Sequence, residues 1–144
     1  MDFLRILFSP FGRIGRMAYW LGSIFQSIAL LLALDLTNFA QTQMSAIRSM
    51  PPETLKAHTG DALGLAAVAL LSISICLWWG FAIAAKRWHD RGKTGFWVLI
   101  NLLPLIGPLW QFIECGFLPG TLGRNPYGPP GGIETASNTA EVFS

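Results

Sequence analysis

Charged residues are scarce in this chain. Only 12% of its 144 residues are Asp, Glu, Lys or Arg, whereas 52% are hydrophobic, and the mean hydropathy is +0.47. So few charges cannot cover the surface of a soluble globule. This excludes a soluble catalytic domain, and the modest net charge of +2 leads us to expect no nucleic-acid partner.

Cysteine is also rare, and ionisable groups are missing from the apolar part of the chain. The two cysteines, Cys76 and Cys115, lie at different expected depths, so we predict no disulfide. Neither has another soft ligand nearby in sequence, and we predict no metal site and no cofactor. The lack of intramembrane acids and bases argues against a proton relay or a charge-driven transporter core.

What the chain does contain is three long stretches without charge, Met17 to Leu34, Leu63 to Ala85 and Phe96 to Ile113. As helices they would reach roughly 27 to 35 Å, which matches a hydrocarbon core of about 30 Å. We therefore predict an all-α integral membrane protein with one domain over residues 1–130. Its three transmembrane helices would cover about residues 17–38, 63–86 and 95–114, and residues 131–144 would form a disordered polar tail.

Turn and cap residues refine the first half of this scheme. Met1 to Phe8 is apolar enough for a short interfacial helix, and Gly15 can cap a helix that begins at Arg16. The link over residues 35–62 is polar and should lie outside the membrane. Within it, Pro52 can open a short helix to His58, which Gly60 would stop.

The second half is predicted as a hairpin. Gly92 can take the left-handed position after the second span, and Thr94 can cap the third span, so these two spans should be antiparallel neighbours. Pro104 and Pro108 predict a kink or a break in the third span.

The distribution of Lys and Arg predicts the orientation. With the N-terminus inside, seven of these residues face the cytoplasm and three face the periplasm. The positive-inside rule thus favours a cytoplasmic N-terminus and, with three spans, a periplasmic C-terminus.

Four motifs carry a family resemblance. They are Gly12-Arg13-Ile14-Gly15-Arg16-Met17-Ala18-Tyr19-Trp20, Lys86-Arg87-Trp88-His89-Asp90 with Thr94-Gly95-Phe96-Trp97, Pro104-Leu105-Ile106-Gly107, and Asn125-Pro126-Tyr127-Gly128. In this order they resemble the domain-of-unknown-function 805 (DUF805) family of small bacterial inner-membrane proteins. Lys86, Trp88, Thr94, Phe96 and Gly15 depart from the family's usual residues, and all but Gly15 keep charge, bulk or capping chemistry. The resemblance implies a helical domain of the bacterial cytoplasmic membrane and implies no activity.

Six residues are candidates for a site. Arg13, Arg16, Arg87 and Arg91 should lie at the headgroup level, where guanidinium groups can bind anionic lipid phosphates. The alternative is that they only orient the protein and cap helix ends. Asp90 can serve as a conformational staple, a side-chain contact that joins the first helix to the hairpin, or it can form a purely local ion pair. His89 can titrate near neutral pH, but no nucleophile or ligand set accompanies it.

These features predict a structural or interaction component of the inner membrane rather than an enzyme, with no catalytic residue assigned. Its expected partners are membrane lipids, anionic ones included, a second copy of the chain, or another membrane protein. Two other readings stay open. One is a membrane enzyme that acts on phospholipid headgroups through His89 and Asp90, and the other is a small channel or transport subunit that acts as an oligomer.

Overall fold

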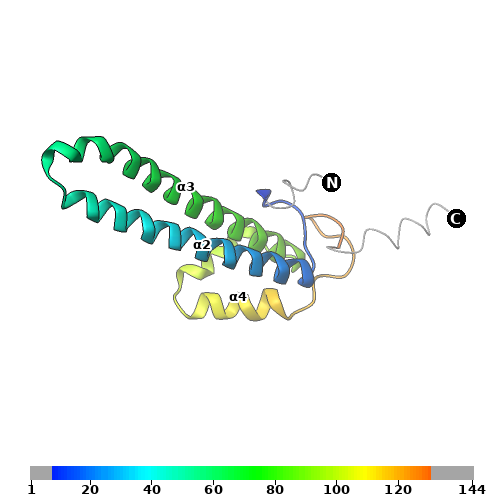
Figure 1. Ribbon diagram of the computed structural model, residues 1–144. Coiled ribbons are helices and arrows are strands. Elements are labelled where there is room, and N and C mark those ends of the chain that lie inside the picture. Colours follow the sequence, from blue (N-terminus) through cyan, green and yellow to red (C-terminus); the bar gives the residue numbers. More distant parts are fainter. Residues whose placement is uncertain (1–7, 131–144) are drawn as a thin grey trace. The chain divides into compact units, whose positions relative to one another are not determined.

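The computed structural model describes residues 8–130, except the side chains of residues 55–57, and this part of the chain is helical without strands. Its elements are α2 (Arg16–Arg48), α3 (Pro52–Asp90), the 3-10 helix η1 (Gly95–Leu102) and α4 (Ile106–Gly116) (Figure 1). The predicted interfacial helix at Met1 to Phe8 and the predicted disordered tail at 131–144 lie outside the described residues, apart from Phe8 itself.

The chain divides into two compact units. We call residues 25–78 the arm unit. The basic-end unit comprises residues 1–24 and 79–144, of which 8–24 and 79–130 are described. Each unit is considered by itself below.

Helix α2 begins where the sequence predicted. The Gly15 carbonyl accepts a hydrogen bond from the Tyr19 N–H at 3.0 Å, which is the first bond of a helix that Gly15 caps. The helix then runs to Arg48 because residues 23–50 contain no glycine or proline to interrupt it. The link predicted over residues 35–62 is therefore helical in all but the turn at residues 49–51.

That turn is set by two prolines. Pro52 occupies the first position of α3, where its missing N–H costs nothing, and the Thr54 N–H bonds the Pro51 carbonyl at 3.1 Å. A proline disfavours the helical conformation of the residue before it, so α2 ends ahead of this pair. Gly60 lies inside α3 and does not stop it, because propagation of an established helix tolerates a single glycine.

Two helices are long and apolar enough to cross a membrane, Arg16–Arg48 and His58–Asp90. Their most apolar windows are only 11% and 17% buried, whereas a core helix of a soluble protein would bury most of this window. Large apolar side chains such as Leu31 and Leu70 are more than 60% exposed. Such surfaces match a lipid environment, and they bear out an all-helical chain with two candidate spans.

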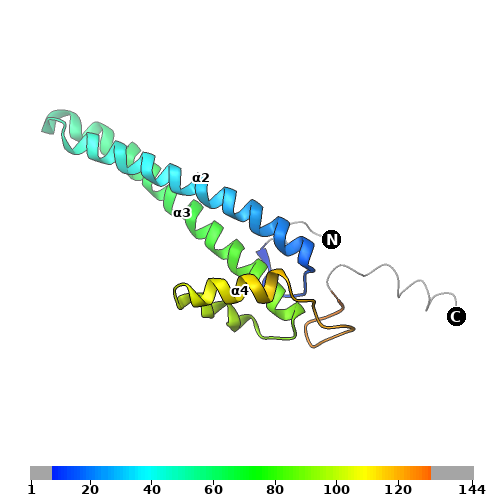
Figure 2. The same ribbon diagram turned by 90° about the horizontal axis from the view of Figure 1, so that it is seen from below.

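The arm unit packs through small residues. Ala33, Ala40 and Ile47 are buried on α2, and Ala62, Ala69 and Cys76 are buried on α3. Each set recurs every seven residues, which is the spacing of a left-handed coiled coil. Small side chains let two backbones approach closely, as is usual for membrane helices. The two arms run antiparallel on either side of the turn (Figures 1 and 2).

The predicted third span is not one helix. The chain breaks after η1 at Leu103 to Leu105, and α4 is only 11 residues long, or about 16 Å. The break at Pro104 was predicted, but a continuous third transmembrane helix is not present. Neither piece has the length needed to cross a bilayer.

The basic-end unit encloses the last turns of α3. All nine residues from Ala82 to Asp90 are buried, so neighbouring segments cover every face of this helix end. The core there consists of Tyr19, Ile83, Trp88 and Cys115. Three of the residues in this helix end, Lys86, Arg87 and Asp90, are charged and buried, and burial of a charge requires a partner.

Candidate functional site

Asp90 lies between two buried arginines at the end of α3. Arg13, which precedes α2, approaches Oδ1 of Asp90 with Nη2 at 2.9 Å and donates to it from Nε at 3.0 Å. Arg87, one turn before Asp90, pairs with Oδ2. The three side chains are 1%, 0% and 6% exposed in the order Arg13, Arg87, Asp90. Asp90 thus contacts the segment before α2 through Arg13 and forms a local ion pair with Arg87 as well.

Arg13 also donates hydrogen bonds to backbone carbonyls of residues 121–128. It donates from Nη1 to the carbonyls of Gly123 at 2.8 Å and Gly128 at 3.1 Å, and from Nη2 to that of Thr121 at 2.8 Å. With the hydrogen bond from Nε to Asp90, each of the three nitrogens of this guanidinium donates to an acceptor. Arg13 thus fixes residues 121–128 at the end of α3.

The backbone at Asp90 completes this attachment. Its carbonyl accepts from the Thr121 N–H at 2.8 Å and from the Thr121 hydroxyl at 3.2 Å. Gly120 packs directly on the Asp90 carboxylate, and a Cβ at this position would fall within 3 Å of the carboxylate oxygens. Only glycine lets the chain pass so close to the ion pair.

His89 is held from two sides. Its Nδ1 lies 3.3 Å from the Gly12 carbonyl, and since a carbonyl can only accept, Nδ1 carries the proton in this contact. The imidazole stacks on the Tyr127 ring with centroids 4.0 Å apart and planes 5° from parallel. Asn125 donates to the His89 carbonyl at 2.8 Å and shapes the turn by accepting from the Tyr127 N–H at 2.9 Å.

A second ion pair joins the hairpin turn to α4. Glu114 accepts from Arg91 Nη2 at 3.0 Å and from Lys93 Nζ at 2.7 Å. Burial alone would raise the pKa of the Glu114 carboxyl, but the hydrogen bonds from Lys93 and Arg91 outweigh it and hold this pKa below its ordinary value of 4.5. The ammonium of Lys93 also lies 5.1 Å and 4.7 Å from the ring centroids of Trp88 and Trp97.

The turn itself has the predicted form. Gly92 has φ +72°, its N–H bonds the His89 carbonyl at 2.9 Å, and the Lys93 N–H bonds the Trp88 carbonyl at 2.9 Å. This pair of bonds is a Schellman motif. Thr94 occupies the predicted N-cap position of η1, although its side chain makes no capping bond.

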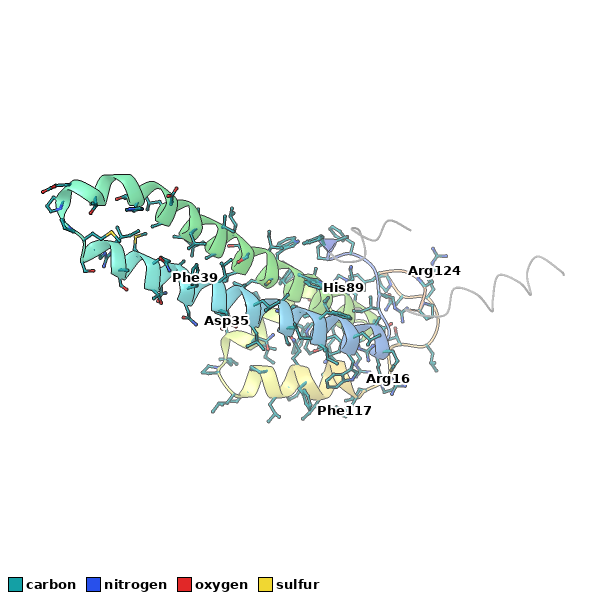
Figure 3. All side chains as sticks on the ribbon, viewed as in Figure 1. Arg16, Asp35, Phe39, His89, Phe117 and Arg124 are labelled. Atoms are coloured by element: carbon teal, nitrogen blue, oxygen red, sulfur yellow. The ribbon has the colours of Figure 1, made fainter. Side chains whose placement is uncertain are left out.

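The remaining arginines differ from this buried set. Arg91 is 19% exposed and donates to Glu114 and to the Pro119 carbonyl. Arg16 is exposed and donates a single hydrogen bond, to the Phe117 carbonyl at 3.3 Å. Arg124 is exposed and, within the described part of the chain, makes no hydrogen bond or ion pair (Figure 3). These last two offer guanidinium donors to an external anion.

The ionisable side chains of this cluster are engaged with one another and with the backbone. Both oxygens of Asp90 are ion-paired, and His89 is bonded, stacked and buried. No group of three or more His, Cys, Asp or Glu that could hold a metal ion occurs among residues 8–130. Both cysteines are free and buried, and burial raises the pKa of the Cys115 thiol to about 12, so this thiol is unreactive.

Sequence reasoning missed four members of the site, namely Glu114, Thr121, Asn125 and Tyr127. Glu114 carried a signal, since it is the acid that ends the third apolar stretch. Asn125 and Tyr127 belong to a motif recognised in the sequence. The contacts of this motif with Arg13 and His89 were not predicted, since Gly128 lies 115 positions after Arg13 and Asn125 lies 36 positions after His89.

Comparison with known proteins agrees with the motifs. The family described as "Protein of unknown function (DUF805)" matches residues 7–129. The chain is 26% identical over 149 aligned positions to the uncharacterized protein YiiR of Escherichia coli K12, covering 85% of each chain. It is 37% identical over 57 positions to the inner membrane protein YhaH of the same strain, covering 40% of this chain and 45% of that protein. No solved structure matches.

Proposed function

Because the chain belongs to the DUF805 family, whose function is unknown, we propose from its geometry that it is a non-catalytic component of the bacterial inner membrane. It binds anionic lipid headgroups through the exposed arginines of its basic-end unit. One observation carries this proposal. The side chains of Arg13 and Arg87 are buried and paired with acceptors inside the protein, whereas Arg16 and Arg124 stay exposed.

The different roles of the buried and the exposed arginines follow from the chemistry of the guanidinium group. A buried arginine with all its donors bonded cannot turn to a phosphate without breaking its internal contacts. An exposed arginine binds phosphate through paired donors at little cost. Arg16 stands at the first position of α2, where the chain enters its first apolar stretch, and this is the depth of the headgroups.

The orientation belongs to the same proposal. Arg13 holds the carbonyls of Thr121, Gly123 and Gly128, so the C-terminal segment lies at the same end of α3 as the N-terminal segment. The predicted placement of the two ends on opposite membrane faces does not fit these contacts. With both ends in the cytoplasm, eight Lys and Arg face inward and two, Arg48 and Lys56, face outward. This asymmetry is stronger than the one predicted with three spans.

Native mass spectrometry of protein released from nanodiscs of phosphatidylethanolamine and cardiolipin tests the headgroup site. The double variant Arg16→Ala, Arg124→Ala should lose the bound cardiolipin that the wild type retains. Arg48→Ala is the matched control, because it removes an exposed arginine from the other predicted membrane face and should leave retention unchanged.

Equal cardiolipin retention by wild type and double variant would refute the headgroup site. In that case the exposed arginines would have to act on a partner protein, and crosslinking in intact cells with the same variants would show which copy or partner they contact. Phosphatidylethanolamine serves as the negative probe in the mass spectrometry, since it is zwitterionic and carries no net charge for these residues to attract.

A further inference from the structure

The segment between the hairpin turn and the end of α4 begins and ends at the same level of the molecule. Lys93 and Glu114 are 21 positions apart, yet their side chains meet at 2.7 Å. A chain that crossed a bilayer over this interval would separate the two groups by about 30 Å. Residues 95–113 therefore form a loop with both ends at the same depth.

The reversal is a tight turn at Leu105. This residue has φ +67° and ψ −52°, and the Ile106 N–H bonds the Pro104 carbonyl at 2.8 Å, which defines a γ-turn of the rare, strained form. Gly107 then packs against the Ile100 carbonyl so closely that a Cβ there would overlap it. As a result α4 returns alongside η1, as Figure 2 shows.

The backbone of this turn is largely satisfied without water. Pro104 and Pro108 have no N–H, and the N–H groups of Leu103, Ile106, Gly107 and Leu109 all bond carbonyls within the turn. Of the donors in residues 103–109, the Leu105 N–H alone lacks a partner in the structure. Irregular backbone is tolerated at membrane depth only when its polar groups are satisfied in this way.

The outer surface of the loop is apolar. Residues 95–113 contain no charge, and Phe96, Leu102 and Leu105 are 80%, 78% and 85% exposed. The polar side chains Asn101 and Gln111 turn inward, where they bond each other at 2.6 Å. Exposed apolar patches of this kind do not persist in water.

The loop is also continuous with the membrane-entering part of α2. Trp20, on the second turn of α2, donates from Nε1 to the Gly116 carbonyl at 3.2 Å and meets Phe112 ring to ring at 5.5 Å. The apolar surface of α4 thus extends the apolar surface of a candidate span at the same depth.

We infer that η1 and α4 form a re-entrant hairpin seated in one leaflet, the cytoplasmic one, with acyl chains covering its exposed side chains. The 11 residues of α4 reach about 16 Å, roughly half of the hydrocarbon core. The tip at Leu105 lies near the bilayer midplane, and the ion pair of Lys93 with Glu114 stays at the headgroups. This inference rests on apolar contacts and is independent of headgroup binding by the exposed arginines.

Two measurements on the full chain test it. Green fluorescent protein and alkaline phosphatase are each fused after Ser144 and, as a control, inserted in the turn after Met50. We expect fluorescence without phosphatase activity at Ser144 and the reverse at Met50. Phosphatase activity at both Ser144 and Met50 would mean a third crossing and would overturn the proposal.

The second measurement is depth. Leu105→Cys and Leu122→Cys carry a nitroxide in vesicles of phosphatidylethanolamine and phosphatidylglycerol, with the wild type as the labelling blank because both native thiols are buried. We expect oxygen, but not a water-soluble nickel complex, to relax the nitroxide at position 105. The nickel complex should relax the nitroxide at position 122. Nickel relaxation at both positions would place the loop in water and overturn the proposal. Leu102→Cys repeats the test if the Leu105 variant does not fold.

Discussion

The buried Asp90 carboxylate should be the single most important side chain for stability. Asp90→Asn keeps shape and volume but leaves Arg13 and Arg87, whose side chains are 1% and 0% exposed, with charges that nothing neutralises. Removal of one partner of a buried ion pair costs about 3–5 kcal/mol. Since three carbonyls remain at Arg13, we expect the lower end, about 3 kcal/mol, or a roughly 100-fold shift of the folding equilibrium.

The assay is unfolding by sodium dodecyl sulfate in mild detergent micelles, followed by tryptophan fluorescence. Asp61→Asn is the control, because Asp61 is exposed on α3 and a surface change of this kind stays within about 0.5 kcal/mol. A double-mutant cycle with Arg13→Gln isolates the pair and should show a coupling energy of about 1–3 kcal/mol. If Asp90→Asn unfolds at the same detergent fraction as Asp61→Asn, the reasoning about buried charge is wrong.

Three further outcomes are expected. Gly120→Ala should destabilise the protein by about 1–3 kcal/mol in the same titration, because the added Cβ would push on the Asp90 carboxylate. Gly60 lies inside a helix with open space around it, so Gly60→Ala should stabilise the protein by up to about 1 kcal/mol. Tyr127→Ala should speed proteolysis of the segment at 119–130 by removing the ring stack, worth about 0.5–1.5 kcal/mol, while Tyr127→Phe should match the wild type; equal cleavage rates would count against the stack. The pKa of Glu114 lies below its ordinary value of 4.5 in the folded state. Its ion pairs therefore stabilise the protein fully above pH 4.5, and this stability is lost as the pH falls through the folded-state pKa. Glu114→Gln should abolish this loss at acid pH, and an unchanged pH profile of the variant would contradict the reasoning.

Local features of the fold were predictable because they depend on neighbours in sequence. The start of α2 at Arg16 followed from Gly15 and the apolar run behind it, and the turn at Gly92 followed from basic residues and a glycine after an apolar helix. A contact of Asp90 with the first helix was also proposed from the sequence, because acids are rare among the basic residues at this end.

The helical course of residues 35–62 was predicted only in part, for the short helix that begins at Pro52, because polarity was taken to end the two apolar helices. Ala33, Ala40, Ala62 and Ala69 carry a seven-residue pattern of small side chains, but alanine is too common for that spacing to stand out. The absence of glycine and proline between residues 23 and 50 was the better signal.

The break at Pro104 was predicted, but the return of α4 alongside η1 was missed for a different reason. Composition and length alone fit a crossing helix, and a proline usually only bends one. What decides against crossing is the contact of Lys93 with Glu114, and no property of the apolar stretch between them reveals it. The same holds for residues 121–128, whose carbonyls are gathered by an arginine more than 100 positions earlier.

That arginine also sets the order in which the protein can be completed during its synthesis. Arg13 leaves the ribosome before both long helices, but its acceptors at Thr121, Gly123 and Gly128 are 108 to 115 residues behind it. Until they emerge, the guanidinium has to stay in contact with water or lipid phosphate. Both long helices are therefore inserted before the basic end can close, and a nascent chain that stops short of residue 121 presents unsatisfied charges that quality-control proteases can recognise.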